Sequence, residues 1–477
     1  MVSQISGVVL LKLGREWLSR CKLEIRHEVI VLGAGPAGLN AAKYAANSGC
    51  DVALIDSAPK LGGQYWRHTG NEKLDQSIHH NFDQGSLLID AVSTNPRITV
   101  YSQRTIWSIS VISGEVILRT KDGAFITAKL IIATGAYDRT IPFPGWDIPG
   151  VMTAGAAQSL LKGHGVLAGK RIVVAGTGPF LLPVAEGVSS HGGNVVALLE
   201  AGGKYAWLRG ALGLAQNPAK ALEGLGYLWS LRKNKVAMHH REAIIAAHAG
   251  EDGLLESVTV ARIDAQFQVK SRYNLKCDVA AITWGFTPDT SLAGALNLTQ
   301  VVASDGSVIV SVDDDQRATH NHQGVEIFAA GEITGVGGSD LALIEGAIAG
   351  LAASDSSKNV KKLKSLRRRA ERFARVLEKV YRISAGWKGW LTPDTIICRC
   401  EEVSYQEICN AQADLNVCDA KSAKLMTRSG MGMCQGRICS RSIFELMGSS
   451  DADRVNGTFR PIISPITLGE LAAEGLL

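Results

Sequence analysis

A glycine-rich turn between a buried strand and a helix is the feature that most constrains the fold of this chain. Residues 28–32 read as a buried strand, residues 33–38 follow the pattern G-x-G-x-x-G, and residues 39–48 are an alanine-rich stretch typical of a helix. A second strand at 51–56 ends in Asp56, 23 positions after the first glycine. This order of strand, glycine turn, helix, strand and acid predicts a βαβ unit of an α/β domain.

Each position in this unit has a physical reason that points to a bound dinucleotide. Gly33 allows the tight turn, Gly35 lets a pyrophosphate approach the backbone, and Gly38 lets the helix pack closely on the strand. The helix N-terminus offers N–H groups and a partial positive charge, and Asp56 can accept hydrogen bonds from ribose hydroxyls. A glycine turn without a ligand is the plainer alternative, but the complete unit favours a ligand. The predicted contacts are Gly33, Gly35, Pro36, Ala37, Gly38 and Asp56.

Three later segments indicate which dinucleotide this is. Residues 129–136 are a strand ending in Ala-Thr-Gly, residues 325–332 are a strand ending in Gly-Glu, and residues 61–64 read Leu-Gly-Gly-Gln. These segments resemble the remaining fingerprints of the two-dinucleotide-domain flavoproteins, which include glutathione and thioredoxin reductases. The resemblance implies FAD in a discontinuous domain of residues 26–145 and 286–355. It implies further FAD contacts from Gly63, Gln64, Thr134, Gly135, Gly331 and Glu332. Glu332 stands where that family usually has Asp.

A second glycine turn lies in residues 146–285, which correspond by position to the family's NAD(P)H domain. A strand at 170–175 precedes Gly-Thr-Gly-Pro-Phe-Leu, so that Leu181 replaces the third glycine. Its side chain is expected to push helix and strand apart or to occupy the pyrophosphate approach. If a nucleotide were bound, Glu200 at the end of the next strand would favour one with a free ribose 2′-hydroxyl over one with a 2′-phosphate. We expect a retained structural domain that does not bind NAD.

Other reactive side chains in this part of the chain are few. No Cys-x-x-Cys pair lies in residues 26–355, so disulfide-reductase chemistry is disfavoured, and Cys50 and Cys277 read as packing residues. Adjacent histidines at 79–80 and 239–240 do not share a helix face and are interpreted as surface residues. Tyr137 and Arg139 follow the Ala-Thr-Gly strand and are candidates for lining a cavity beside the flavin.

Positive charge is concentrated in one segment. The formal net charge is +5, and residues 358–375 carry nine Lys or Arg and one acid, so the rest of the chain is slightly acidic. Nucleic-acid binding is therefore not indicated. Apolar residues recur at helical spacing over 358–382 and predict an amphipathic helix within a linker of residues 356–392. No apolar run reaches the length of a membrane span. Residues 1–25 form an extension without a clear role. We expect a cytoplasmic protein, with peripheral attachment to the inner membrane face as an alternative.

Four cysteines near the C-terminus carry the second chemical signal. Cys398 and Cys400 form a C-x-C pair, and after 33 intervening residues Cys434 and Cys439 form a C-x4-C pair on a glycine-rich loop. Four thiolates suit zinc or an iron–sulfur cluster. The spacing differs from a C-x2-C zinc knuckle, and together with the flavin context it favours [2Fe–2S]. Short helices are predicted around the pairs, one starting at a Ser404–Glu407 capping box and one capped by Asp419.

Residues 393–477 resemble the small [2Fe–2S] domain typified by bacterioferritin-associated ferredoxin. The whole chain resembles the alpha subunits of opine oxidases. The resemblance lies in the order of its parts: a flavin domain, a degraded nucleotide domain, a basic helix and this cysteine domain. It is also similar to hydroxyproline and dye-linked proline dehydrogenase alpha subunits and to a subunit of hydrogen cyanide synthase. The resemblance covers residues 27 to the C-terminus and does not specify the substrate.

The resemblance implies a heteromeric oxidoreductase acting on CH–NH donors. A catalytic beta flavoprotein of amino-acid-oxidase type would oxidise the C–N bond of an opine such as octopine or nopaline. This chain would then transfer electrons to a quinone or a cytochrome chain. The resemblance allows a second flavin, FMN, at a subunit interface and a small third subunit. A self-sufficient NADH-dependent reductase and a structural scaffold remain open as alternatives.

Overall fold

A computed structural model describes most of the chain, and the predicted extension and the first histidine pair lie largely outside it. The described residues are 24–78, 81–205, 218–356, 360–415, 417, 419–457, 459–460 and 462–473. The predictions for residues 1–23 and for His79 and His80 therefore lie outside the described residues. Within these ranges, no helix is both long enough and apolar enough to cross a bilayer.

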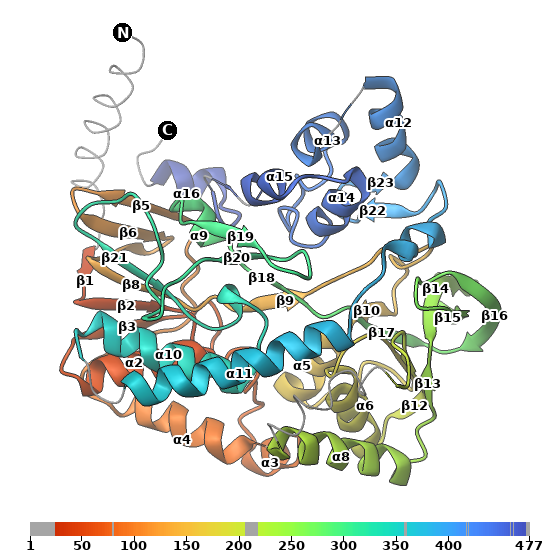
Figure 1. The fold of residues 1–477 in the computed structure, drawn as a ribbon, viewed down its shortest axis with the longest axis horizontal. Helices are drawn as coiled ribbons and strands as arrows, with labels where there is room; N and C mark the ends of the chain where they lie inside the picture. Colours follow the sequence, from red (N-terminus) through yellow and green to blue (C-terminus); the bar gives the residue numbers. More distant parts are fainter. Residues whose placement is uncertain are drawn as a thin grey trace.

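The first unit is built on a five-stranded parallel sheet (Figure 1). Its strands are short aliphatic runs buried on both faces, as expected for a parallel sheet covered on both sides. In spatial order they are β21 (Glu326–Ala329), β8 (Lys129–Ile132), β2 (Val29–Leu32), β3 (Val52–Ile55) and β4 (Ile98–Tyr101). Strand β21 pairs with β8 in register, Ile327 opposite Leu130, so two distant parts of the sequence share this sheet.

Helices cover one face of this sheet and a smaller sheet covers the other. Helices α2 (Pro36–Asn47), α4 (Phe82–Ser93) and α10 (Ser339–Ala353) share a core with Val29 and Val31. Helices α2 and α10 pack so closely that a Cβ on Gly346 would lie only 2.0 Å from the Ala37 carbonyl oxygen. The opposite face packs on a four-stranded sheet in the order β1 (Glu24–Arg26), β7 (Gly123–Thr127), β6 (Glu115–Thr120) and β5 (Ser108–Ile112).

Short elements complete the unit and lead into the second one. They are α3 (Glu72–Ile78), α9 (Ser291–Ala295) and the strand pairs β9 (Ala136–Asp138) with β18 (Phe286–Pro288) and β19 (Gln300–Val302) with β20 (Val308–Val310). The antiparallel pair β9–β18 lies where the chain leaves the first unit and returns to it.

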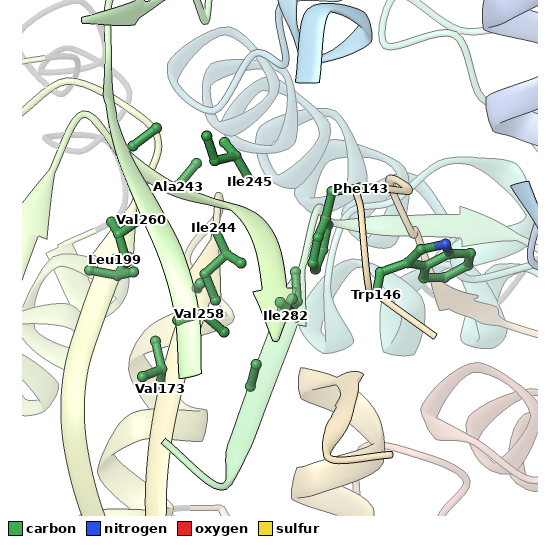
Figure 2. Close-up of a cluster of buried hydrophobic side chains, with 14 of the residues drawn as sticks. Phe143, Trp146, Val173, Leu199, Ala243, Ile244, Ile245, Val258, Val260 and Ile282 are labelled. Atoms are coloured by element: carbon green, nitrogen blue, oxygen red, sulfur yellow. The ribbon is translucent and has the colours of Figure 1, made fainter. Parts of the chain in front are cut away.

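The second unit repeats the architecture with its own five-stranded parallel sheet. The strands are β10 (Val151–Thr153), β17 (Val279–Thr283), β11 (Arg171–Gly176), β12 (Asn194–Glu200) and β13 (Met238–His240). The helices that belong to this unit are α5 (Ala154–His164), α6 (Leu181–Ser190) and α8 (Pro218–Lys233). A three-stranded antiparallel sheet of β14 (Glu242–Ala249), β15 (Leu255–Ile263) and β16 (Val269–Lys276) packs on the parallel sheet. Figure 2 shows the core between these sheets, where Val173 and Leu199 face Ile244 and Val258.

The amphipathic helix predicted for 358–382 is α11 (Val360–Val380), which crosses both units (Figure 1). Its Arg367 is buried and pairs with Asp314 at 3.1 Å. The following 3-10 helix η3 (Ala385–Trp390) buries Trp387 and Trp390, and Trp390 stacks on Phe267 at 5.8 Å. Both tryptophans thereby attach the linker to the second unit.

The C-terminal module is a cluster of short helices around one hydrophobic core. The predicted caps are present: Ser404 and Glu407 hydrogen-bond each other reciprocally, and Asp419 accepts from the Ser422 N–H at 2.9 Å. Its elements are β22 (Ile396–Cys398), β23 (Val403–Ser404), α12 (Tyr405–Leu415), α13 (Ala420–Thr427), α14 (Ser440–Met447), α15 (Asp451–Asn456) and α16 (Leu468–Ala473).

Candidate cofactor sites

The first glycine turn has the close approaches that its sequence predicts. Gly33 has φ +99°, and a Cβ there would lie 2.3 Å from the Ala133 carbonyl oxygen. A Cβ on Gly38 would lie 1.7 Å from the Gly33 carbonyl oxygen, so helix α2 and strand β2 meet without room for a side chain. At Gly35 a Cβ would meet no protein atom within 4 Å. The turn is thus closed on the protein side and open at Gly35, where a pyrophosphate would approach.

Asp56 holds the turn from the end of β3. Its two carboxylate oxygens accept from the backbone N–H groups of Ala34 at 2.5 Å and Ala58 at 2.6 Å. Helix α2 begins at Pro36, whose ring removes an N–H that would lack a partner. The carboxylate also faces the cavity described below, where its remaining lone pairs can accept from a ribose.

Most of the predicted FAD contacts converge on one cavity. Gly33, Gly35, Pro36, Asp56, Gly63, Gln64, Thr134, Gly135 and Glu332 line it. Ala37, Gly38 and Gly331 pack immediately behind it, and a Cβ on Gly331 would lie 2.8 Å from that of Ala37. Three separate parts of the sequence therefore meet at the glycine turn.

Two glutamates, the half-buried Glu332 and the buried Glu345, organise the loop after β21. The Gly338 N–H donates to Glu332 at 2.8 Å, which places this carboxyl at the start of α10, and burial raises the pKa of Glu332 to about 7. Glu345 accepts from the Gly331 N–H at 2.8 Å and from the Thr334 hydroxyl at 2.9 Å, and burial raises its pKa to about 8. Sequence analysis missed Glu345. An acid within an alanine-rich buried helix was the available signal.

The cavity is large and continues beyond the glycine turn. Its volume is about 3590 Å³, against the 300–1,000 Å³ typical of a small-molecule pocket. Tyr137 and Arg139 line it, as predicted, and so does His240, which was interpreted as a surface residue. Arg139 is paired with Glu445 of the C-terminal module at 2.7 Å, and burial lowers the pKa of Arg139 to about 9. The cavity therefore touches both α/β units and the cysteine module.

The second glycine turn differs from the first at its helix. Helix α6 begins only at Leu181, whose side chain is buried in the core between helix and sheet. The N–H of Leu181 donates to the Gly178 carbonyl at 3.3 Å, and that of Leu182 to the Pro179 carbonyl at 3.2 Å. The next residue, Pro183, has no N–H. At this helix terminus the N–H groups of Leu181 and Leu182 are therefore already used, and Pro179 and Pro183 have none.

Glu200, the acid of the second unit, is turned inward. It accepts from the Thr177 hydroxyl at 2.6 Å, the Gly202 N–H at 2.7 Å and the Gly178 N–H at 3.2 Å. Burial raises the pKa of Glu200 to about 7. These bonds tie Glu200 to the glycine turn of the second unit, which still lines the cavity and is open at Gly178, where a Cβ would meet no protein atom within 4 Å.

The four C-terminal cysteines come together as two thiol pairs. The Cys439 thiol donates to Cys398, and this bond lowers the pKa of Cys398 to about 5. The thiols of Cys400 and Cys434 form the second pair, and the Cys434 backbone N–H also donates to Cys400. Within the described residues, no three Cys, His, Asp or Glu side chains are arranged around a single ion. By contrast, Cys50 and Cys277 are isolated and buried, and burial raises their pKa values to about 11 and 12.

The glycines of the cysteine loop bring backbone close to sulfur. The Gly430 N–H donates to Cys398 Sγ at 3.4 Å. A Cβ on Gly432 would lie 2.2 Å from that of Cys400. Such N–H donors stabilise a negatively charged thiolate group.

Cations without carboxylate partners lie beside the cysteines. Burial and Arg437 lower the pKa of Arg460, while Cys439 and Cys434 act in the opposite direction. Burial and Arg460 likewise lower the pKa of Lys424, opposed by Cys439. No Asp or Glu is among the main causes of either shift in pKa. The negative charge that would balance these cations is that of cysteine thiolates.

One arginine joins the cysteine loop to the first unit. Arg437, between Cys434 and Cys439, lies 3.4 Å from the Asp289 carboxylate. The backbone of Asp289 is bonded to the Ala-Thr-Gly loop: its N–H donates to the Gly135 carbonyl at 3.0 Å, and its carbonyl accepts from Thr134 at 2.9 Å. The two candidate sites are thus connected through Asp289. Neither Asp289 nor Arg437 had a sequence signal.

Comparison with known proteins agrees with this geometry. Residues 27–350 match the pyridine nucleotide-disulphide oxidoreductase family. The A subunit of opine oxidase from Agrobacterium tumefaciens (strain Ach5) is 30% identical over 94% of this chain and 91% of its own length. The chain belongs to the pyridine nucleotide-disulphide oxidoreductase family and, within it, groups with the opine oxidase A subunits. Hydrogen cyanide synthase subunit HcnB of Pseudomonas aeruginosa is 29% identical over 86% of this chain and 90% of its own length.

A solved structure shows the same fold. L-proline dehydrogenase from P. horikoshii has a TM-score of 0.65 and 17% identity, covering 94% of this chain and 80% of that one. These findings confirm the predicted family resemblance and the two-domain flavoprotein fold. They identify the chain as an oxidoreductase and indicate FAD as its cofactor.

Proposed function

We propose that this chain is the FAD and [2Fe–2S] subunit of a heteromeric opine or amino-acid oxidase and transfers electrons out of it. The observation that carries the proposal is the Arg437–Asp289 contact, which connects the cysteine loop with the loop of Thr134 and Gly135. Similarity to the opine oxidase A subunits over nearly the whole chain supports the same conclusion. The predicted domain boundaries, 26–145 with 286–355, 146–285, 356–392 and 393–477, are part of the proposal.

The cysteine arrangement favours [2Fe–2S] over zinc. Each iron of such a cluster takes two thiolates, which matches the pairs Cys398–Cys439 and Cys400–Cys434. The nearby cations Arg460 and Lys424 would offset the negative charge of a tetrathiolate cluster.

Protein residues would position the two cofactors. When bound, FAD supplies two-electron exchange and the cluster supplies one-electron transfer. Gly35 and the N-terminus of α2 would hold the pyrophosphate, and Asp56 the ribose. Glu345 would hold the Gly331 loop in place behind the site.

The reaction proposed for the complex is oxidative cleavage of a secondary amine such as octopine or nopaline. The amine loses two electrons and two protons to give an imine, and water then hydrolyses the imine to an amino acid and a 2-oxo acid. The C–N oxidation is assigned to a partner flavoprotein of amino-acid-oxidase type. The electrons leave through this chain to a quinone or a cytochrome chain, which fits a location in the cytoplasm or peripherally at the inner membrane face.

The size of the cavity supports a further ligand. A volume of about 3590 Å³ exceeds the needs of one dinucleotide, and Glu445 and Arg454 of the cysteine module help to line it. A second flavin, FMN, at the interface with the partner is part of the proposal. A small third subunit is the other component that the family resemblance allows.

NAD is not proposed as a cofactor. The late start of α6 and the inward Glu200 engage most backbone donors of the second glycine turn, including the N–H groups of Gly178, Leu181 and Leu182. Bleaching of the flavin by NADH alone under anaerobic conditions would contradict this and favour a self-sufficient reductase.

Metal and flavin analysis of the purified chain tests the proposal. We expect one FAD, two iron and two acid-labile sulfide per chain. Cys434→Ser should lose the iron and keep the flavin, whereas Cys409→Ser, outside the four cysteines, should keep both. Zinc in place of iron, or no flavin absorbance, would defeat the proposal. Wild-type turnover by the Cys434→Ser complex would instead favour a scaffold role.

Co-purification and a substrate panel then test the complex. A partner with amino-acid-oxidase features should co-purify, and the complex should oxidise opines. Since HcnB is nearly as similar as the opine oxidase A subunits, release of hydrogen cyanide is assayed too, and the panel includes proline and hydroxyproline. Activity on only one of these compounds would assign the complex to the corresponding group of enzymes instead of the opine oxidases. The electron-transfer role proposed for this chain would be unchanged.

A further inference from the structure

Helix α11 carries more positive charge than the carboxylates around it neutralise. Nine of its 21 residues are Lys or Arg and two are Glu, a balance of 9 − 2 = +7. Asp313, Asp314 and Asp315, between β20 and β21, lie against the helix and lower the balance to 7 − 3 = +4. Glu345 of α10 acts on Arg367 from the interior, and counting it as fully charged still leaves +3. An excess of positive charge therefore remains at this surface.

Two of these cations are held by the protein itself. Lys364 pairs with Asp315 at 2.6 Å, and Arg367 pairs with Asp314 at 3.1 Å and with Glu371 at 2.9 Å. Both basic side chains are largely covered, with 21% and 10% of their surface exposed. They attach α11 to the first unit and are not available to an external ligand.

Five other cations lie on one exposed face of α11. They are separated by 7, 4, 3 and 4 residues, spacings that return to the same side of a helix. We call them the basic stripe: Lys361, Arg368, Arg372, Arg375 and Lys379, all of them exposed. Among the described residues the stripe has one ion pair, Arg368 with Asp314 at 3.4 Å. Both side chains of that pair are more than half exposed, so it contributes little. The stripe spans about 27 Å.

The two ends of the stripe differ in their surroundings. Arg375 and Lys379 border the large cavity, and so does the half-buried Glu378, which offsets part of their charge. Lys361 and Arg372 do not line that cavity, and Lys362, next to Lys361, is exposed as well. The N-terminal part of the stripe therefore presents its charge to solvent and is separate from the cofactor cavity.

The stripe lacks the apolar centre that a protein partner would need. The exposed large apolar side chain of α11 is Leu366, which is 41% exposed. It lies two residues before Arg368 and hence about 160° around the helix from it. Specific protein interfaces have an apolar or aromatic centre and are depleted in Lys. A row of cations without such a centre fits a surface of many mobile anionic groups better.

The position of α11 also makes a nucleic-acid duplex a poorer match. Figure 1 shows α11 lying lengthwise across both units, and α11 packs on α10 of the first unit. It therefore presents a row of charge along one side of the molecule. A helix that reads DNA enters the major groove, which this packing does not allow.

We propose that the basic stripe of α11 binds the protein to an anionic phospholipid surface. This inference rests on the proposed function, in which electrons leave to a quinone or a cytochrome chain, because a quinone is dissolved in the bilayer. Each Lys or Arg close to an anionic bilayer adds to the attraction. Because the stripe contains no apolar side chain, the attachment is electrostatic, and salt weakens it.

The test uses the full-length protein with its cofactors. Iron, labile sulfide, flavin and melting temperature are measured first, so that damage to the fold is separated from loss of binding. The probes are vesicles of phosphatidylcholine with and without phosphatidylglycerol, and the bound fraction is measured by flotation at low and at high salt. A DNA duplex of mixed sequence and co-purification of the partner flavoprotein are the comparison arms.

Two triple variants remove the same amount of charge from different surfaces. The stripe variant combines Lys361→Gln, Lys362→Gln and Arg372→Gln, three exposed residues outside the cavity. The control combines Lys73→Gln on α3 with Arg272→Gln and Lys276→Gln on β16, which are also exposed. We expect the stripe variant to bind phosphatidylglycerol vesicles about a hundredfold more weakly at low salt, since each cation contributes about fivefold. The control should bind like wild type.

Several results would overturn the proposal. Equal vesicle binding by wild type and the stripe variant is one, and wild-type binding that does not depend on phosphatidylglycerol is another. Tighter binding of wild type to DNA than to these vesicles would make the stripe a nucleic-acid surface. Loss of the partner flavoprotein from the stripe variant, with vesicle binding unchanged, would make it a subunit interface. Salt-sensitive vesicle binding by a wild-type protein without iron would support the lipid surface while defeating the proposed function.

Discussion

Arg437 and Asp289 join the cysteine loop to the segment that supports the flavin loop, with Nε and Oδ2 3.4 Å apart. Arg437 also donates to the Ser291 hydroxyl and the Ile463 carbonyl, both at 3.2 Å. One guanidinium therefore holds the loop of Cys434 and Cys439 against the chain segment that supports Thr134 and Gly135.

Asp289→Asn should loosen this contact. The neutral amide leaves Arg437 half-buried without its counter-charge, at a cost of roughly 1–3 kcal/mol. We expect faster hydrogen exchange in residues 430–447 and slower reduction of the cluster after photoreduction of the flavin, followed by freeze-quench EPR.

Glu401→Gln is the control for this prediction, because it breaks the exposed pair with Arg428 inside the same module. Its effect on both measurements should be small. Equal exchange and equal reduction rates in Asp289→Asn and wild type would show that the contact does not hold the module.

Gly35→Val should abolish FAD binding while the protein still folds. Gly35 has φ −76°, which valine adopts, and its Cβ would meet no protein atom within 4 Å, so the new side chain occupies only the space of the pyrophosphate. Flavin absorbance after purification and the melting temperature measure the two effects. Gly224→Ala, at another open position, should keep its flavin, and retained flavin in Gly35→Val would place FAD elsewhere.

Arg460→Gln should make the cluster harder to reduce. Arg460 lies beside Cys434 and Cys439, and losing its positive charge destabilises the reduced, more negative state. An effect on the order of 1 kcal/mol, about 40 mV for one electron, is expected. An EPR redox titration measures the midpoint potential. Arg428→Gln, beside Glu401, is the comparison, and a shift to a higher potential in Arg460→Gln would contradict the charge argument.

Glu345→Gln should flatten the dependence of stability on pH. Burial raises the pKa of Glu345 from 4.5 to about 8, so the folded carboxyl retains a proton that the unfolded one has lost between these values. Stability contributed by this group is complete below pH about 4.5 and falls as pH rises towards 8. Melting temperatures of wild type and Glu345→Gln across this range are the measurement. Parallel curves would mean that Glu345 does not titrate there.

Local patterns in the sequence predicted the elements that position the sites. The G-x-G-x-x-G turn predicted the junction of β2 and α2, and apolar spacing predicted α11. The Ser404–Glu407 and Asp419 caps predicted the starts of α12 and α13. These signals are readable because turns, caps and helical periodicity depend on residues within a few positions of one another. The family resemblance, confirmed by the comparisons, added the joining of 129–136 with 325–332.

Only the tertiary structure decided which side chains act between these elements. Asp289 and Arg437 are 148 positions apart, and Glu345 reaches Gly331 by lying on the inner face of α10. The late start of α6 and the pairing of Cys398 with Cys439 likewise depend on packing. By itself, the sequence determined the family, the glycine turns and the four cysteines, since each is a short motif. The structure decided burial, charge pairing and the exposed face of α11, because these arise from contacts between distant segments that no local pattern records.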